Sequence, residues 1–399
     1  MSRGWQERSI GELCDLATGG TPSRSNPEYF GGDIKWLVSG DIHQREITDC
    51  AGRITEAGQR NSNAKLLPLD SVMIALNGQG KTRGTVAILR TEATCNQSLV
   101  SIAPKPSAGL LPEFLYWNLH GRYEEIRRMT SDDDKDRRGL NMGLIRAISI
   151  PVPSVAEQQR LIGILEEALD GIAAAKANAE RNLRNARALF ESHLQSVFSQ
   201  VGAGWKEHAL SDLIKIQNGY AFKSAEYTDS GYFVIRISNV QEGEITLDNP
   251  RYIRLANKKL ERFVLNAGDI LVSLTGNIGR VGVIRQEQLP AVLNQRVARI
   301  TVRNECIERD FLFRFLSSRS FRERLQDAGH GAAQQNVSTT EIESVRIMLP
   351  TKLEQRRIAQ ELEVLADESA RLGDLYERKL DALAAFKRSL LHQAFSGQL

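Results

Sequence analysis

Residues 150–198 read IPVPSVAEQQRLIGILEEALDGIAAAKANAERNLRNARALFESHLQSVF, and the pattern of this stretch indicates the architecture of the chain. Beyond Pro153, apolar and small side chains recur with the alternating spacing of three and four residues that is typical of a coiled-coil seam. The stretch predicts one helix of about 40 residues, which would span roughly 60 Å at ~1.5 Å per residue. Such a helix cannot bury its stripe alone, and the expected seam positions are Leu165, Leu169, Ile172, Leu183 and Phe190.

The same pattern returns at the end of the chain, with expected seam positions at Leu362, Tyr376, Leu380, Leu383 and Leu390. Upstream residues also match at an offset of 197–200, as Trp5 matches Trp205 and Gln158 matches Gln355. Residues 1–199 and 200–399 are therefore two copies of one module. The predicted boundaries are 1–155 for a first domain, 156–199 for its helix, 200–352 for a second domain and 353–399 for the second helix.

Each predicted domain mixes strands with helices. Runs typical of strands, such as 71–76 and 269–274, alternate with Gly-rich turns, and helical stretches follow near 113–128 and 309–325. We predict an α/β (α+β) fold in which two domains are separated by two long antiparallel coiled-coil helices, with a pseudo-two-fold axis from the repeat. The alternative is that each long helix packs only on its own domain.

The composition describes a globular chain. Of 399 residues, 41% are hydrophobic and 25% charged, which excludes global disorder. No apolar run approaches the ~18 residues of a membrane helix, and the first residues lack the apolar core of a signal peptide, so we expect a soluble cytoplasmic protein without membrane contact. The four cysteines show no C-x-x-C spacing, which argues against zinc ribbons and disulfide frameworks. The net charge of +3 is too small to indicate nucleic-acid binding by itself.

The sequence predicts neither a catalytic nor a cofactor site. Gly80-Lys81-Thr82 resembles the end of a phosphate-binding loop, but Ala75 stands where the pattern needs its first glycine, and residues 83–89 resemble a strand rather than a helix. The acidic run 132–136 is better explained as a solvated loop than as a metal site, because the second copy lacks these carboxylates. No histidine pair has zinc spacing and no G-x-S-x-G motif occurs, so we expect no metal and no catalytic residue.

Polar residues on tight turns are the candidates for contacting DNA bases, because Asn, Gln and Arg side chains match the edges of adenine and guanine. Arg also outnumbers Lys by 15 to 5 in residues 201–350, a bias that suits bidentate contacts. For Asn96-Gln97 and Asn294-Gln295 we favour a different role: they satisfy backbone groups at the start of a strand rather than contact bases. The candidate DNA contacts are Ser39, Asp41, His43, Asn77, Gln79, Lys81, Thr82, Arg83, Arg138, Asn141, Arg236, Asn239, Thr275, Asn277, Arg280, Gln334, Gln335 and Asn336.

Several stretches point to a known family as an ordered set. The chain contains TGGTPS at 18–23, WLVSGDI at 36–42, CNQ at 95–97, ISIPVPSVAEQ at 148–158 and QAFSGQL at 393–399. Together they resemble the specificity subunit of type I restriction-modification systems, and the resemblance covers essentially the whole chain. The second copy departs from the pattern at its start, with QNGYAF at 217–222 in place of the Gly-Gly-Thr-Pro-Ser string.

The resemblance implies that each domain is a target-recognition domain for one half of a bipartite, asymmetric double-stranded DNA site. It implies that the helices act as a spacer and dock two modification (methyltransferase) subunits. S-adenosylmethionine, ATP and magnesium would then belong to the modification and restriction (translocase) subunits, and this chain would hold no cofactor. The alternatives are a coiled-coil adaptor that organises protein partners without reading a DNA sequence, and, less favoured, an enzyme such as a methyltransferase.

Overall fold

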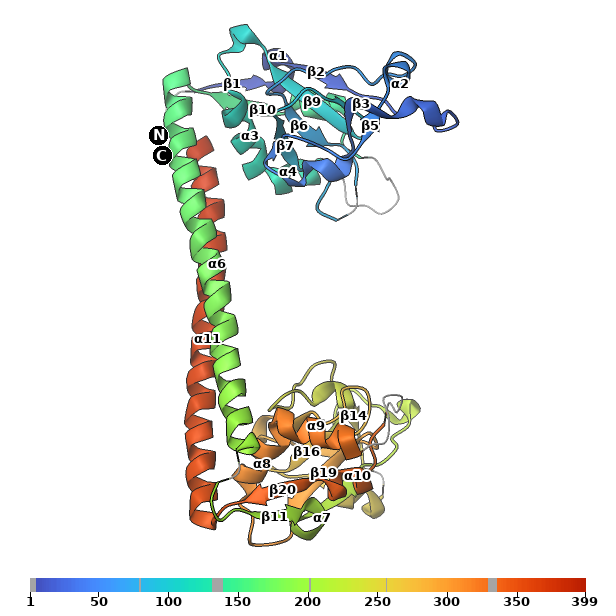
Figure 1. Cartoon of the computed structure of the whole chain (residues 1–399), viewed down its shortest axis with the longest axis vertical. Helices are drawn as coiled ribbons and strands as arrows, with labels where there is room; N and C mark the ends of the chain where they lie inside the picture. The colour runs from blue at the N-terminus through green and yellow to red at the C-terminus, as the bar shows by residue number, and fades with distance from the viewer. Residues whose placement is uncertain (1–4, 79, 131–138, 201, 256, 329–335) are drawn as a thin grey trace. The chain divides into compact units, whose positions relative to one another are not determined.

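The computed structural model describes residues 5–78, 80–130, 139–200, 202–255, 257–328 and 336–399 (Figure 1). The chain divides into two compact units. Unit 1 comprises Met1–Ala179 and Lys379–Leu399, and unit 2 comprises Glu180–Arg378. Each unit therefore contains one α/β domain and part of each long helix. The four segments proposed from the sequence remain a prediction as domain boundaries.

The long helices α6 (Val155–Ser199) and α11 (Lys352–Phe395) pair within both units (Figure 1). In unit 2 the Ser369 hydroxyl donates to the Ala186 carbonyl at 2.8 Å, and Arg187 forms an ion pair with Glu377. In unit 1, Leu165 of α6 and Leu390 of α11 share one core. Because the early part of α6 meets the late part of α11, the pairing is antiparallel. The predicted pairing is confirmed within each unit, and the alternative of two unpaired helices is wrong.

The predicted seam positions are all shielded from solvent, although to different degrees. Four are buried, namely Leu165, Ile172, Leu362 and Leu390. The other six are half-buried, namely Leu169, Leu183, Phe190, Tyr376, Leu380 and Leu383.

The described residues of the unit 1 domain form three sheets. The five-stranded sheet has the order β2 (Cys14–Thr18), β9 (Leu99–Pro104), β6 (Val72–Ala75), β7 (Val86–Leu89) and β4 (Glu46–Ile47). The second sheet has the order β5 (Arg53–Ile54), β3 (Phe30–Leu37) and β8 (Thr94–Cys95), and the third pairs β1 (Gln6–Ser9) with β10 (Ser149–Val152). The helices are α1 (Ile10–Leu13), α2 (Glu56–Arg60), α3 (Pro112–Gly121), α4 (Tyr123–Arg128) and α5 (Met142–Ala147).

The domain of unit 2 repeats this plan. One sheet has the order β12 (Ile214–Asn218), β19 (Val297–Val302), β16 (Ile270–Ser273) and β17 (Val281–Val283). Another has the order β14 (Tyr252–Ile253), β13 (Tyr232–Ile235), β18 (Ala291–Leu293) and β15 (Val264–Leu265), and β11 (Lys206–Ala209) pairs with β20 (Arg346–Leu349). The helices are α7 (Leu210–Leu213), α8 (Arg309–Ser317), α9 (Arg319–Ala328) and α10 (Thr339–Ser344). The matching strand orders confirm the predicted repeat and mixed fold class.

A buried glutamine joins each domain to the start of its long helix. The Gln158 side-chain amide donates to the carbonyls of Gly109 (2.7 Å) and Pro153 (2.9 Å), and its oxygen accepts from Leu111 N–H at 2.9 Å. In the second copy Gln355 makes the equivalent three bonds, to the Cys306 and Pro350 carbonyls and from Glu308 N–H. Both side chains are fully buried. We call Gln158 and Gln355 the glutamine clamps.

Candidate nucleic-acid interface

A short 3-10 turn follows β3 and its counterpart β13, and one side chain orders it in each domain. Asp41 Oδ2 accepts from Val38 N–H at 2.8 Å, and Asn239 Oδ1 accepts from Arg236 N–H at 3.2 Å. Asn239 is fully buried, and its amide also donates to the carbonyls of Thr246 and Asp248. Asp41 and Asn239, both candidates for DNA contact, therefore hold the turns in shape. Asn239 has no surface to offer a base.

The loop between β6 and β7 is fastened to α4 and to the first turn. Arg127 Nη1 donates to the Gly80 carbonyl at 2.6 Å, and the Tyr123 hydroxyl donates to the Lys81 carbonyl at 3.0 Å. His43 Nε2 lies 3.1 Å from Thr82 Oγ1. The structure thus brings His43 and Thr82 together from two separate candidate stretches. Tyr123 and Arg127 were missed from the sequence because nothing local marks them as loop contacts.

A third segment, at the start of α5, completes this group in unit 1. A Cβ at Gly139 would lie 1.9 Å from Asn77 Oδ1, so the segment runs directly against the β6–β7 loop. Leu140 N–H donates to the Leu76 carbonyl, and Asn141 Oδ1 caps α5 by accepting from Leu144 N–H at 3.0 Å. Asn141 is thereby used as a helix cap, while Asn77 and Lys81 remain exposed.

The remaining candidates in unit 1 have simpler placements. Ser39 begins the 3-10 turn that Asp41 orders, and it is half-buried. Arg83 is also half-buried, within the β6–β7 loop. Gln79 and Arg138 lie outside the described residues, as do Gln334 and Gln335 of the second copy.

In unit 2 the three equivalent segments surround a polar cavity of about 600 Å³. Thr275 forms an isolated antiparallel bridge with Asn336, and Val337 N–H donates to the Leu274 carbonyl at 2.8 Å. The Thr275 hydroxyl is shielded from solvent and has no hydrogen-bond partner among the described residues. The cavity is lined by Ile237, Thr275, Gly276, Gln295, Arg296 and Asn336.

Two of these lining residues, Gln295 and Arg296, were not candidates from the sequence. In unit 1 the matching pair does satisfy local groups, because Asn96 Oδ1 accepts from Ser98 N–H and Gln97 Oε1 accepts from the Thr21 hydroxyl at 2.6 Å. In the described part of unit 2, by contrast, the side chains of Gln295 and Arg296 are exposed and form no hydrogen bond or ion pair. They are therefore available to a ligand in the cavity.

The other candidate residues of unit 2 differ in how freely their side chains could contact DNA. Arg280 Nη1 donates to Gln241 Oε1 at 2.7 Å, and Arg236 donates to the Asn249 carbonyl, so both guanidinium groups already have partners. Asn277 and Asn336 are exposed. In unit 2 the side chains most accessible to a DNA base are thus those of Asn336, Gln295 and Arg296 at the rim of the cavity.

The described residues include side chains of metal-ligating types and the buried thiols of Cys14 and Cys95. No group of three or more His, Cys, Asp or Glu side chains within the described ranges could hold a metal ion. Burial raises the pKa of both Cys14 and Cys95 to about 12, so neither thiol ionises near neutral pH. Among the helices of the described part, none is long and apolar enough to cross a membrane.

Comparison with known proteins agrees with this geometry. The family model described as "Type I restriction modification DNA specificity domain" matches residues 2–180 and again 203–373. The MjaVIII specificity subunit of a type I restriction enzyme from Methanocaldococcus jannaschii is 25% identical over 269 residues, which cover 63% of this chain and 62% of that protein.

Two solved structures share the fold along the full chain. The first, from a type I R-M system, has a TM-score of 0.79 at 18% identity and covers 100% of this chain and 99% of that one. The second, the HsdS subunit from Thermoanaerobacter tengcongensis, has a TM-score of 0.65 at 20% identity and covers 100% and 98%. Since the family model matches both copies of the repeat, the chain belongs to the type I restriction-modification DNA specificity family.

Proposed function

We propose that this chain is the DNA sequence-specificity subunit of a type I restriction-modification complex. In this proposal each α/β domain reads one half of a bipartite, asymmetric target in double-stranded DNA. The chain itself carries no catalytic step. It works in the cytoplasm, together with the DNA that it reads.

The observation that carries the proposal is the repeated meeting of three polar segments in each domain. In both copies the turn after β3 or β13, the loop after β6 or β16 and the segment before α5 or α10 come together. The backbone arrangement is the same, but the side chains differ: Asn77 occupies the position of Thr275, and Ser39 that of Ile237. A shared frame with different exposed side chains suits the recognition of two different half-sites.

The helices supply a surface for protein partners. Leu353, Val364, Leu375 and Phe386 of α11 are 79%, 53%, 51% and 54% exposed. They recur every eleven residues, close to three helical turns, so they lie on one face of the helix. Exposed apolar stripes of this kind mark protein interaction sites, and the proposed partners are two modification subunits that methylate adenine.

The remaining activities belong to the partners in this proposal. S-adenosylmethionine is held by the modification subunits, and ATP and magnesium are used by the restriction subunits that translocate and cleave DNA.

The test is to co-express the chain with its modification subunit and map methylated adenines across the genome. The expected result is one asymmetric motif made of two separated half-sites. A sequence-independent pattern, or binding without sequence preference, would favour the coiled-coil adaptor instead. Methyl transfer by the isolated chain would favour an enzyme.

A further inference from the structure

Both domains have a cavity at the same place, between the start of β3 or β13 and the segment that follows β5 or β14. The cavity is about 430 Å³ in the first domain and about 450 Å³ in the second. A close backbone approach marks both: a Cβ at Gly32 would lie 2.6 Å from the Ile54 carbonyl oxygen, and one at Gly231 would lie 2.3 Å from that of Ile253. The two cavities are therefore structural counterparts.

The charges around the two cavities differ strongly. Residues 251–262 contain five basic residues, Arg251, Arg254, Lys258, Lys259 and Arg262, and one acidic residue, Glu261. This local surplus of four positive charges exceeds the +3 of the whole chain. The counterpart stretch 52–63 has only two basic residues and one acidic residue, and Asp33 replaces Tyr232 on the cavity wall.

The two basic residues in the stretch beside the first cavity are already paired, whereas three of those beside the second cavity are not. Arg53 forms an ion pair with Asp49 at 2.8 Å, and Arg60 lies 3.5 Å from Glu56. In the described part of the second domain, the side chains of Arg254, Lys258 and Lys259 are exposed and form no hydrogen bond or ion pair. Arg254 and Lys258 line the cavity together with one acidic residue, Glu261, and Lys259 is the next residue along the chain. Unpaired surface cations grouped in this way favour an external anion.

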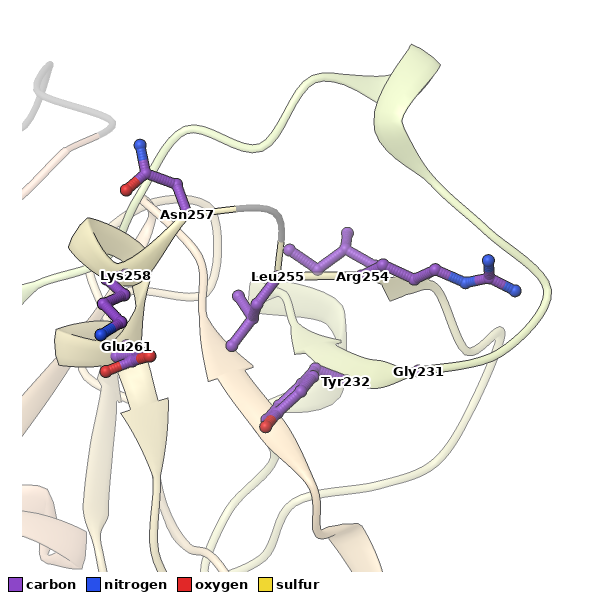
Figure 2. Close-up of a pocket in the computed structure, with 8 residues that line it drawn as sticks. Gly231, Tyr232, Arg254, Leu255, Asn257, Lys258 and Glu261 are labelled. Atoms are coloured by element: carbon purple, nitrogen blue, oxygen red, sulfur yellow. The ribbon is translucent and has the colours of Figure 1, made fainter.

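The cavity of the second domain has an apolar floor between its charged sides. Figure 2 shows the side chains of Leu255 and Tyr232, which both line the cavity, with the Arg254 side chain extending away from them on one side and Lys258 and Glu261 on the other. This arrangement suits a chain of phosphates joined by less polar sugars better than it suits one compact anion. The phosphodiester backbone of DNA has this alternation.

We propose that Arg254, Lys258 and Lys259 form a phosphate-binding surface for the DNA backbone that the first domain lacks. The proposal rests on the proposed function, and adds that the two domains hold the DNA backbone unequally. Such contacts position the protein on the duplex without reading its sequence.

The strand β13 fixes the distance between this surface and the polar cavity at Thr275. Tyr232 lines the basic cavity at one end of the strand, and Ile237, just beyond the other end, lines the polar one. Five residue steps at ~3.3 Å give about 17 Å. Since successive phosphates of one strand are ~3.4 Å apart along the duplex axis, the contacted phosphates lie within about five nucleotides of the bases read by the second domain.

The experiment compares the intact complex with a complex carrying Arg254→Ala and Lys258→Ala. Its dissociation constant is measured between 50 and 200 mM salt, on a duplex containing the mapped target and on a scrambled duplex. Two lost phosphate contacts lower the slope of log K against log salt by about 1.8, so the salt-induced loss of affinity becomes roughly twelvefold smaller. The methylated bases remain unchanged. The matched control is Gln59→Ala with Arg60→Ala at the first-domain cavity, which should leave the slope intact.

An unchanged slope in the Arg254→Ala, Lys258→Ala complex overturns the phosphate surface, as does an equal fall in the control. A fall of affinity on the target alone also overturns it, because that would indicate base contact. The proposed function has a separate readout. It fails if the wild-type complex binds target and scrambled duplexes equally, whatever the slopes show.

Discussion

Replacing a glutamine clamp should lower the free energy of unfolding more than replacing most other polar side chains of this protein. Gln158→Ala deletes three hydrogen bonds to backbone groups at a fully buried position. Each bond contributes about 1 kcal/mol net, and the Leu111 N–H left without a partner adds about 1 kcal/mol or more. We expect the free energy of unfolding of unit 1 to fall by about 4 kcal/mol or more.

Gln158→Glu tests the geometry more sharply than the alanine variant. One carboxylate oxygen still accepts from Leu111 N–H, but the other faces the carbonyls of Gly109 and Pro153, to which it cannot donate when ionised. The folded state therefore raises the pKa of this carboxyl. A carboxyl with a raised folded pKa is destabilising above that pKa, and the destabilisation is relieved as the pH falls through it. Gln158→Ala has no such pH dependence.

The assay is urea unfolding of the full chain combined with peptide-resolved amide hydrogen exchange, because two units need not unfold together. Exchange should rise in residues 105–115 for the Gln158 variants and in residues 303–312 for Gln355→Ala. The adjacent exposed Gln159→Ala is the matched control. If Gln158→Ala costs no more than Gln159→Ala, or if the Glu and Ala variants share one pH profile, the clamp reasoning is refuted.

Three further predictions each concern one or two substitutions. Burial, together with the charge of Lys387, lowers the pKa of His120 to about 4. The stability that neutral His120 contributes is therefore complete above about pH 6.5 and is lost as the pH falls toward 4. His120→Asn should remove about 2 kcal/mol of the difference in unfolding free energy between pH 7.5 and pH 5. The double substitution Val364→Ser, Leu375→Ser should weaken capture of the modification subunit at least tenfold in a pull-down titration. The melting temperature should stay unchanged, because both side chains are exposed. A lowered melting temperature would instead indicate that these side chains belong to the core. Arg296→Ala should relax the methylated motif in one half-site only, by about 1–3 kcal/mol of discrimination, and uniform weakening on every sequence would identify a phosphate contact.

Features that repeat with a short period or a constant offset could be predicted from the amino-acid sequence alone. The spacing of Leu165, Ile172 and Leu390 identified the helices and their pairing, because a stripe on a helix of this length must be buried by something. The match between the two halves gave the repeated fold. The ordered motifs indicated the family that the comparisons then showed.

Which polar side chains are free to contact a ligand could be seen only once the chain was folded. The sequence predicted a DNA contact for Asn239, at a turn, and a backbone-satisfying role for Gln295, at the start of a strand. In the structure Asn239 is buried with its amide bonded to backbone carbonyls, while Gln295 is exposed at a cavity. The difference in charge between the two counterpart cavities likewise became visible only because the structure places Gly32 and Gly231 in equivalent positions. The physical reason is that periodicity reports which face of an element is apolar, whereas the partner of a polar group is set by segments far away in the chain.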